Sequence, residues 1–157
     1  MKRLLISAAE PSGDQLGAAL IRALQALEPI EAFGLAGPAM RENGVEPLAR
    51  MEPMCAMGIM EVIQKLPAIR TAQNALHTGL STQPDALVLI DAPDLHLPLA
   101  KKAKKAGIPT IGWVSPQVWA WRPTRSKTVC KSLDHLLCLF DFEPALFSDI
   151  DAQWLGH

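Results

Sequence analysis

Short apolar runs alternate with segments of helical periodicity along the chain, and this alternation restricts the fold more than any other feature. Apolar runs, read as strands, cover residues 4–9, 30–35, 86–90 and 108–114, with shorter ones at 45–48, 136–140 and 152–155. Apolar side chains recur at helical spacing from 15 to 27, 61 to 80 and 95 to 105, and further helical segments are expected at 39–43, 125–132 and 143–148. Strands alternating with helices favour an α/β fold with a parallel sheet and helices on both faces.

The composition suits one globular domain and excludes several classes of protein. The chain has 157 residues, of which 49% are hydrophobic, enough for a true core. Fifteen basic residues are balanced by sixteen acidic ones, so no excess positive charge is present to bind a nucleic acid, and we expect no such partner. The longest apolar runs fall far short of the roughly 20 residues that cross a bilayer.

The first residues and the cysteines indicate a cytoplasmic protein. The apolar run after Met1 is cut at residues 10–14, before a signal peptide would be complete, so a buried first strand is the better interpretation. Cys55, Cys130 and Cys138 are too few for a disulfide framework and form no C-x-x-C pair, so we expect reduced, buried thiols. The four histidines show no metal-ligand spacing, and no bound metal is expected.

Ligands of open parallel sheets bind beyond the carboxyl ends of the strands, which selects residues 9–14, 91–94 and 115–122. In the first segment, Gly13 could let a ligand approach the backbone at the start of a helix. The alternative is that Ser12 or Asp14 only caps that helix. The glycine patterns of dinucleotide and P-loop sites are absent, which disfavours an ordinary nucleotide-binding domain.

Asp91 is the candidate catalytic residue. It follows five consecutive apolar residues, so its carboxylate would be partly desolvated, held by a stiff strand and able to accept a proton from a substrate hydroxyl. Asp94 is interpreted as the N-cap of the next helix rather than as a second catalyst. The lysines between 101 and 105 are interpreted as a solvated helix face rather than a membrane contact.

Two further segments are rich in side chains suited to sugars or acyl chains. Trp119 and Trp121 share one loop with Arg122, and they either fill a gap in the core or form a binding platform, with Arg122 suited to a phosphate. Four methionines lie between residues 51 and 60, where Pro53 and Gly58 prevent an ordinary helix. An apolar partner must cover these methionines.

Six strings in this sequence together resemble the lipid-A-disaccharide synthase family. They are EPSGD (10–14), GLAGPAM (34–40), AMGIMEVI (56–63), LIDAPDLHLPLA (89–100), VSPQVWAWR (114–122) and LGH (155–157). Each string is weak alone, but all six in the family's order, across essentially the whole chain, are highly specific. The chain departs from the usual pattern at Leu95-His96, where the family has Phe-Asn, at Gly112-Trp113, where it has His-Tyr, and at Asp141, where it has Pro.

The resemblance implies a metal-independent, inverting glycosyltransferase of the GT-B type, built from two Rossmann-like domains and using no cofactor. Such an enzyme transfers 2,3-diacylglucosamine from UDP-2,3-diacylglucosamine to 2,3-diacylglucosamine 1-phosphate. The product is the β-1,6-linked disaccharide of lipid A. We therefore expect a peripheral protein on the cytoplasmic side of the inner membrane of a Gram-negative bacterium.

The resemblance also assigns roles to individual residues. Asp91 would be the general base that deprotonates the acceptor 6-hydroxyl. The residues implied near the transferred sugar are Glu10, Ser12, Gly13 and Asp14. Those implied to meet acyl chains or membrane are Met57, Gly58, Ile59, Met60 and Val62. Those implied on the acceptor side are Ser115, Gln117, Trp119, Trp121 and Arg122.

By this resemblance, residues 1–157 correspond to the N-terminal, acceptor-side Rossmann-like domain, and the C-terminal UDP-binding domain of the family is absent from this chain. We expect the isolated chain to be inactive and its exposed cleft surface to favour self-association. The alternative is a noncatalytic module, derived from that domain, that binds lipid or a partner chain.

Overall fold

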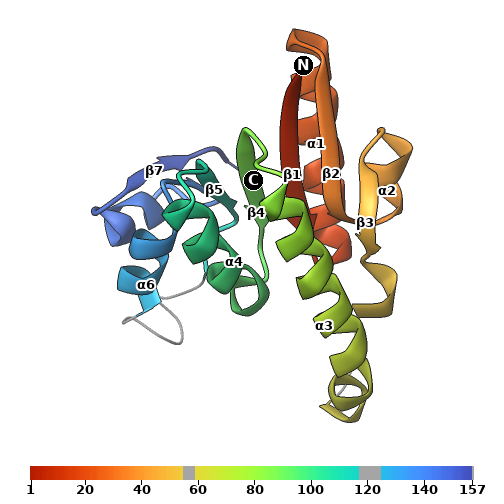
Figure 1. Ribbon diagram of the computed structural model, residues 1–157. Coiled ribbons are helices and arrows are strands. Elements are labelled where there is room, and N and C mark those ends of the chain that lie inside the picture. The colour runs from red at the N-terminus through yellow and green to blue at the C-terminus, as the bar shows by residue number, and fades with distance from the viewer. Residues whose placement is uncertain (55–58, 117–124, 157) are drawn as a thin grey trace. The chain divides into compact units, whose positions relative to one another are not determined.

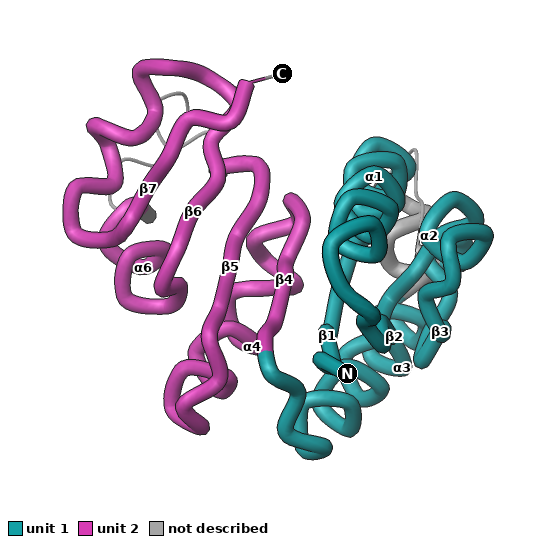
Figure 2. Tube along the Cα trace, turned by 90° about the horizontal axis from the view of Figure 1, so that it is seen from above, with its two compact units in different colours: residues 1–85 teal, residues 86–157 magenta. Residues whose placement is uncertain are grey.

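The computed structural model describes residues 1–54, 59–116 and 125–156, with the backbone alone described at 54, 59–65 and 125. Strands and helices alternate along the chain (Figure 1). The molecule separates into two compact units, Met1–Asp85 and Ala86–His157 (Figure 2). Each unit is an α/β assembly with its own parallel strands.

The first unit contains three parallel strands in the order β3-β2-β1. Its elements are β1 (Lys2–Ala8), α1 (Pro11–Leu27), β2 (Ile30–Ala36), α2 (Pro38–Glu42), β3 (Glu46–Arg50), the 3-10 turn η1 (Glu52–Met54) and α3 (Ile59–Ser81). Helices α1 and α3 lie on opposite faces of these strands (Figures 1 and 2). The core therefore has two apolar layers, one on each side of the sheet.

Alternation along the strands supplies these two layers. Leu5 of β1 is paired in register with Phe33 of β2, and both side chains lie close to Gly79 of α3. Gly34 has a φ of +150°, and a Cβ there would lie 1.9 Å from the carbonyl oxygen of Ile6. Only glycine therefore lets β2 approach β1 this closely.

The second unit contains four parallel strands in the order β4-β5-β6-β7. Its elements are β4 (Ala86–Ile90), α4 (Pro93–Lys105), β5 (Thr110–Trp113), α6 (Arg125–Ser132), β6 (His135–Cys138), the 3-10 turn η2 (Glu143–Phe147) and β7 (Asp151–Trp154). Helix α4 packs against α6. Leu87, Ile90, Leu136 and Phe147 are almost completely inaccessible to solvent and form the centre of this unit's core.

The structure confirms the α/β fold class and most of the predicted elements. Two helices begin earlier than the periodicity predicted, α1 at Pro11 and α4 at Pro93, because each starts on a proline at its first position. The lysines of α4 are exposed, as expected, and Lys104 forms a 3.0 Å ion pair with Asp134. None of the helices in the described residues has the length and apolar character needed to cross a membrane.

Two of the three cysteines have the predicted environment. Cys130 and Cys138 are buried free thiols. Burial raises the pKa of the Cys138 thiol to about 11, so it stays protonated and unreactive near neutral pH. Cys55 lies outside the described residues.

Candidate functional site

The turn between β4 and α4 holds Asp91 in an uncommon backbone conformation. Asp91 is the first residue after β4 and is half-buried. Its φ is +54° and that of Ala92 is +43°, so two consecutive non-glycine residues lie in the left-handed region. Each costs of the order of 1–2 kcal/mol, and such strain persists only where the surroundings impose it. Pro93 then begins α4.

Main-chain hydrogen bonds hold both sides of Asp91. Its N–H donates to the carbonyl oxygen of Trp113 on the neighbouring strand β5, at 2.9 Å. Its carbonyl oxygen accepts a 2.7 Å hydrogen bond from Nδ1 of His96. A carbonyl can only accept, so the hydrogen of the neutral imidazole lies on Nδ1.

His96 is itself buried, with 2% of its surface exposed. Burial lowers the pKa of His96 to about 4, and the hydrogen bond to the Asp91 carbonyl opposes this shift only in part. The ring is therefore neutral near pH 7. It places no positive charge beside the carboxyl group of Asp91.

A small cavity of the second unit opens beside Asp91. Its walls are mainly apolar and come from β4, β5, β6, α4 and α6, with Asp91 and His96 as the polar residues of its lining. Within the described residues, the carboxylate of Asp91 has no hydrogen-bond or ion-pair partner. The carboxylate therefore keeps its capacity to accept a proton from a molecule at this cavity.

The adjacent end of β5 is also strained. Val114 has a φ of +70°, which is a true outlier for a β-branched residue, and its N–H donates to the carbonyl oxygen of Leu137 at 3.1 Å. Val114 lines the cavity beside Asp91. Beside it in the sequence, Nε1 of Trp113 and Oγ of Ser115 are buried without a hydrogen-bond partner in the described part of the chain. Buried polar atoms are normally satisfied, so these two are candidates for contacts with a bound molecule.

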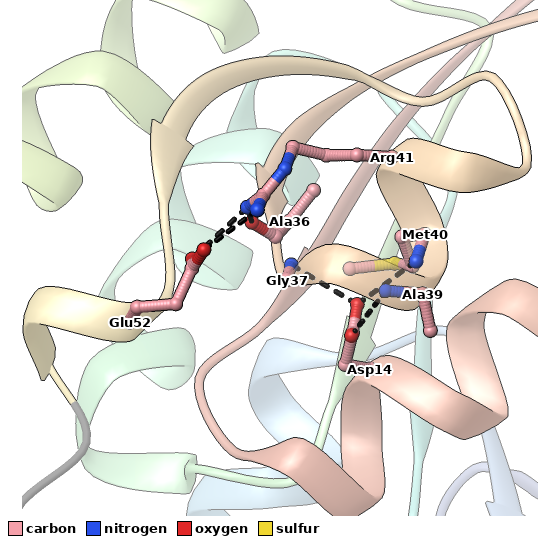
Figure 3. A network of polar contacts seen from close by, with 7 residues as sticks. All are labelled: Asp14, Ala36, Gly37, Ala39, Met40, Arg41 and Glu52. Carbon is pink, nitrogen blue, oxygen red and sulfur yellow. Dashed lines mark hydrogen bonds and ion pairs between the residues drawn. The ribbon is translucent and has the colours of Figure 1, made fainter.

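In the first unit, Asp14 links the string at 10–14 to the string at 34–40 (Figure 3). Its buried carboxylate accepts hydrogen bonds from the backbone N–H groups of Gly37 (3.0 Å), Ala39 (2.8 Å) and Met40 (3.1 Å). A Cβ at Gly37 would lie 2.5 Å from this carboxylate, which explains the glycine. Asp14 therefore caps the N-terminus of α2.

The expected capping residues do not cap their own helices. The N-cap of α1 is Glu10, whose side chain makes no capping hydrogen bond, so the interpretation of Ser12 or Asp14 as the cap of α1 is wrong. The N-cap of α4 is Ala92, so the same interpretation of Asp94 is also wrong. Asp94 instead lies in the first turn of α4, where a negative charge interacts favourably with the helix dipole.

An ion pair connects α2 to η1 (Figure 3). Arg41 of α2 contacts Glu52 of η1 through two hydrogen bonds, of 2.9 and 2.6 Å, and also donates to the carbonyl oxygen of Ala36 at 2.9 Å. The hydrogen bond from Arg41 is the main reason why the pKa of Glu52 falls to about 2. This pair fixes η1 against the end of β2.

The sequence-predicted site residues are divided between the two units. Glu10 and Ser12 are exposed at the start of α1 and Gly13 is buried there, whereas Asp91 and Ser115 belong to the second unit. Ile59, Met60 and Val62 lie on α3, whose side chains are not described at these positions. Met57, Gly58, Gln117, Trp119, Trp121 and Arg122 lie outside the described residues. In the parts of the chain that are described, no three His, Cys, Asp or Glu side chains are grouped to hold a metal ion.

Comparison with known proteins decides the family. A family model described as lipid-A-disaccharide synthetase matches residues 4–157. The chain belongs to this family. It is 42% identical to the lipid-A-disaccharide synthase of Coxiella burnetii (strain Dugway 5J108-111) over 160 residues, which cover 99% of this chain and 43% of the relative. It is also 42% identical to those of Idiomarina loihiensis over 159 residues (99% and 42%) and Neisseria meningitidis serogroup B over 158 residues (98% and 41%).

The chain spans about two fifths of the length of the curated relatives that it matches. Two contacts of its candidate site were missed from the sequence, namely His96 with the Asp91 carbonyl and Asp14 with the start of α2. A signal for the first was present. His96 lies on the same helical face as Ala100 and Ala103, where a polar residue needs a specific partner.

Proposed function

We propose that this chain is the N-terminal part of an inverting glycosyltransferase of lipid A biosynthesis. In this proposal the enzyme transfers 2,3-diacylglucosamine from its UDP derivative to the 6-hydroxyl of 2,3-diacylglucosamine 1-phosphate. Family membership supports this assignment, as does the similarity to lipid-A-disaccharide synthases. Residues 1–157 are the acceptor-side domain, and a second domain of the complete enzyme supplies the UDP site.

Asp91 is the general base of this proposal. The acceptor oxygen O6 forms a bond to the anomeric carbon while the bond from that carbon to UDP breaks on the opposite face. The proton of the 6-hydroxyl passes to the Asp91 carboxylate, and the leaving electron pair stays on the phosphate of UDP. The observation that carries the assignment is the half-buried, unpartnered carboxylate of Asp91 beside a cavity of the described structure.

The other predicted site residues belong to the same proposal. Glu10, Ser12, Gly13 and Asp14 lie near the transferred sugar, although the carboxylate of Asp14 already binds three backbone N–H groups. The group that contacts acyl chains or the inner-membrane surface is Met57, Gly58, Ile59, Met60 and Val62, because flexible methionine side chains adapt to such surfaces. The group that serves the acceptor is Ser115, Gln117, Trp119, Trp121 and Arg122, and the unpartnered hydroxyl of Ser115 supports this role.

The test is Asp91→Asn in the enzyme that carries this chain as its N-terminal part. Asparagine keeps the size of the side chain but cannot take up the proton, so kcat is expected to fall about 10²- to 10⁴-fold, with KM for the acceptor little changed. Disaccharide formation from both substrates is measured, together with the melting temperature. Asp94→Asn is the matched control, because Asp94 is an exposed carboxylate three residues further on. The kcat of this variant should stay within about twofold of that of the parent enzyme.

Two outcomes would overturn the proposal. If the Asp91→Asn enzyme keeps the kcat of the parent, Asp91 is not the general base. If the parent enzyme binds 2,3-diacylglucosamine 1-phosphate but transfers no sugar to it, the noncatalytic lipid-binding alternative holds instead.

A further inference from the structure

We infer that His96 is a positioning residue for the transfer reaction, because its Nδ1 holds the carbonyl group of Asp91 and so fixes where the Asp91 carboxylate lies at the cavity. The inference rests on the proposed function, in which Asp91 is the base. It concerns a residue that does not touch the reacting atoms. His96 acts on the main chain of its neighbour.

The hydrogen-bond pattern of the turn leaves this task to His96. The N–H groups of Leu95 and His96, in the first turn of α4, both donate to the carbonyl oxygen of Ala92, at 3.1 Å each. The carbonyl of Asp91 lies one residue earlier and receives the side chain of His96 instead, at 2.7 Å. The N–H on the other side of Asp91 is held by β5. Both peptide groups that flank the Cα atom of Asp91 are thus held by hydrogen bonds.

The strained backbone explains why the hydrogen bond from His96 to the Asp91 carbonyl is needed. Asp91 and Ala92 both have positive φ values, which residues with a Cβ adopt only under constraint. Without the His96 hydrogen bond, the Asp91–Ala92 peptide is free to turn toward an ordinary conformation. Such a turn swings the Asp91 carboxylate away from its present place, and a displacement of about 1 Å can cost a reaction as much as about 100-fold in rate.

The chemistry of the His96 ring suits a positioning residue better than a catalytic one. His96 is buried and neutral, and its Nδ1 hydrogen is already donated to a carbonyl. A protonated histidine beside Asp91 would stabilise the carboxylate and weaken it as a base. A neutral ring fixes the backbone of Asp91 without this loss of basicity.

The experiment compares His96→Leu with His96→Asn in the enzyme that carries this chain as its N-terminal part. Leucine has no donor, whereas Nδ2 of asparagine occupies nearly the same position relative to the backbone as Nδ1 of histidine. For His96→Leu we expect kcat to fall about 10- to 100-fold with KM within about threefold. For His96→Asn we expect kcat within about threefold of the parent. Amide hydrogen exchange at Asp91 should accelerate in the leucine variant and not in the asparagine variant.

Controls separate positioning from loss of stability. Leu99→Ala removes a buried side chain of α4 that does not line the cavity, so it should lower the melting temperature without changing kcat below that temperature. A kcat for His96→Leu equal to that of the parent contradicts the inference. Equal losses in the leucine and asparagine variants also contradict it.

The parent protein supplies a test that needs no variant. The ¹⁵N chemical shifts of the His96 ring must show the hydrogen on Nδ1; a hydrogen on Nε2 instead overturns the inference. Failure of the proposed function gives a different result, because Asp91→Asn would then keep full activity. If Asp91→Asn is inactive and His96→Leu is fully active, only the role of His96 is refuted.

Discussion

Three buried polar side chains, Asp14, His96 and Glu143, each bind main-chain groups at a turn. Asp14 receives three N–H groups of the β2–α2 turn, and His96 donates to the carbonyl of Asp91. Glu143 accepts from the N–H groups of Leu139 and Phe140, at 3.1 and 3.0 Å. Each of these side chains replaces a hydrogen bond that regular secondary structure does not supply at its turn.

The buried His96 predicts a loss of stability in mild acid. The pKa of His96 is lowered from 6.5 to about 4 by burial, so between these values the unfolded chain binds a proton that the folded chain does not. The contribution of the neutral His96 ring to the free energy of unfolding is therefore fully present above pH 6.5. It is lost as the pH falls toward 4, and the total loss is about 3 kcal/mol. Urea unfolding at about pH 7 and about pH 4.5 measures this difference.

Two histidine variants test the source of the acid sensitivity. His96→Asn has no titrating ring, so it should lose less stability than the parent over this pH range. His135→Asn changes a half-exposed histidine that pairs with Asp151 at 2.9 Å. This variant should lose as much stability as the parent between about pH 7 and about pH 4.5, because its His96 is unchanged. An unchanged acid response in His96→Asn would assign the step to other groups.

At the scale of single residues, the sequence predicts Asp91 as the candidate base but does not predict the contact of its carbonyl oxygen with His96. A carboxylate after a wholly apolar strand is a local pattern, and the structure places it at a strand end beside a cavity. His96 was examined only for metal-ligand spacing, which it lacks. Its true contact depends on the left-handed φ values at Asp91 and Ala92, and no residue type at those positions indicates them.

Among the elements, the side chain of Asp14 in α1 holds the start of α2. Asp14 lies in the first turn of α1 and caps α2, which has only five residues. A helix this short has little stability of its own, so it depends on its cap and on the burial of Met40. Arg41 then carries the connection to η1 through Glu52.

Replacing Asp14 should therefore destabilise the first unit. Asp14→Ala leaves three N–H groups around Gly37 without their acceptor, and we expect a loss of about 2–4 kcal/mol in the free energy of unfolding. Asp14→Asn keeps one side-chain oxygen and should lose less. Urea unfolding measures both variants. Glu42→Ala, at an exposed carboxylate of α2, is the matched control and should change stability by at most about 0.5 kcal/mol. Equal effects at positions 14 and 42 would refute the capping role.

Element types were predicted better than element starts. The strand at 86–90 was predicted with the bounds of β4, because both of its ends are marked by polar and turn-forming residues. The start of α1 was placed four residues late, since the polar string 10–14 has the composition of a loop. Pro11 at the first helical position, rather than Ser12 or Asp14, was the informative signal.

For the whole molecule, periodicity decided the fold class, because alternating strand and helix patterns are local properties of the chain. The division into two compact units was not predicted, since it depends on contacts between distant residues. The resemblance to the family rests on six strings spread along the sequence, and the family model that confirms it matches residues 4–157. Six of the predicted substrate residues lie outside the described structure, namely Met57, Gly58, Gln117, Trp119, Trp121 and Arg122.

The proposed function predicts how residues 1–157 behave when they are tested alone. They match 41–43% of the length of the relatives, and a glycosyltransferase of the proposed kind must hold donor and acceptor together. The isolated chain should therefore form disaccharide at less than about one hundredth of the rate of an enzyme that carries both domains. Turnover with both substrates is the measurement. A rate within about tenfold of the two-domain enzyme would show that residues 1–157 are sufficient.

The close approach of Gly37 to Asp14 restricts how this chain can be recombined with its relatives. The two positions are 23 residues apart, so a crossover between them can bring a side chain from one parent against a carboxylate from the other. A hybrid that acquires any side chain at position 37 must give up Asp14 as well, and with it the start of α2. Crossovers before residue 14 or after residue 40 keep the pair together and are the safer junctions for building chimeric enzymes.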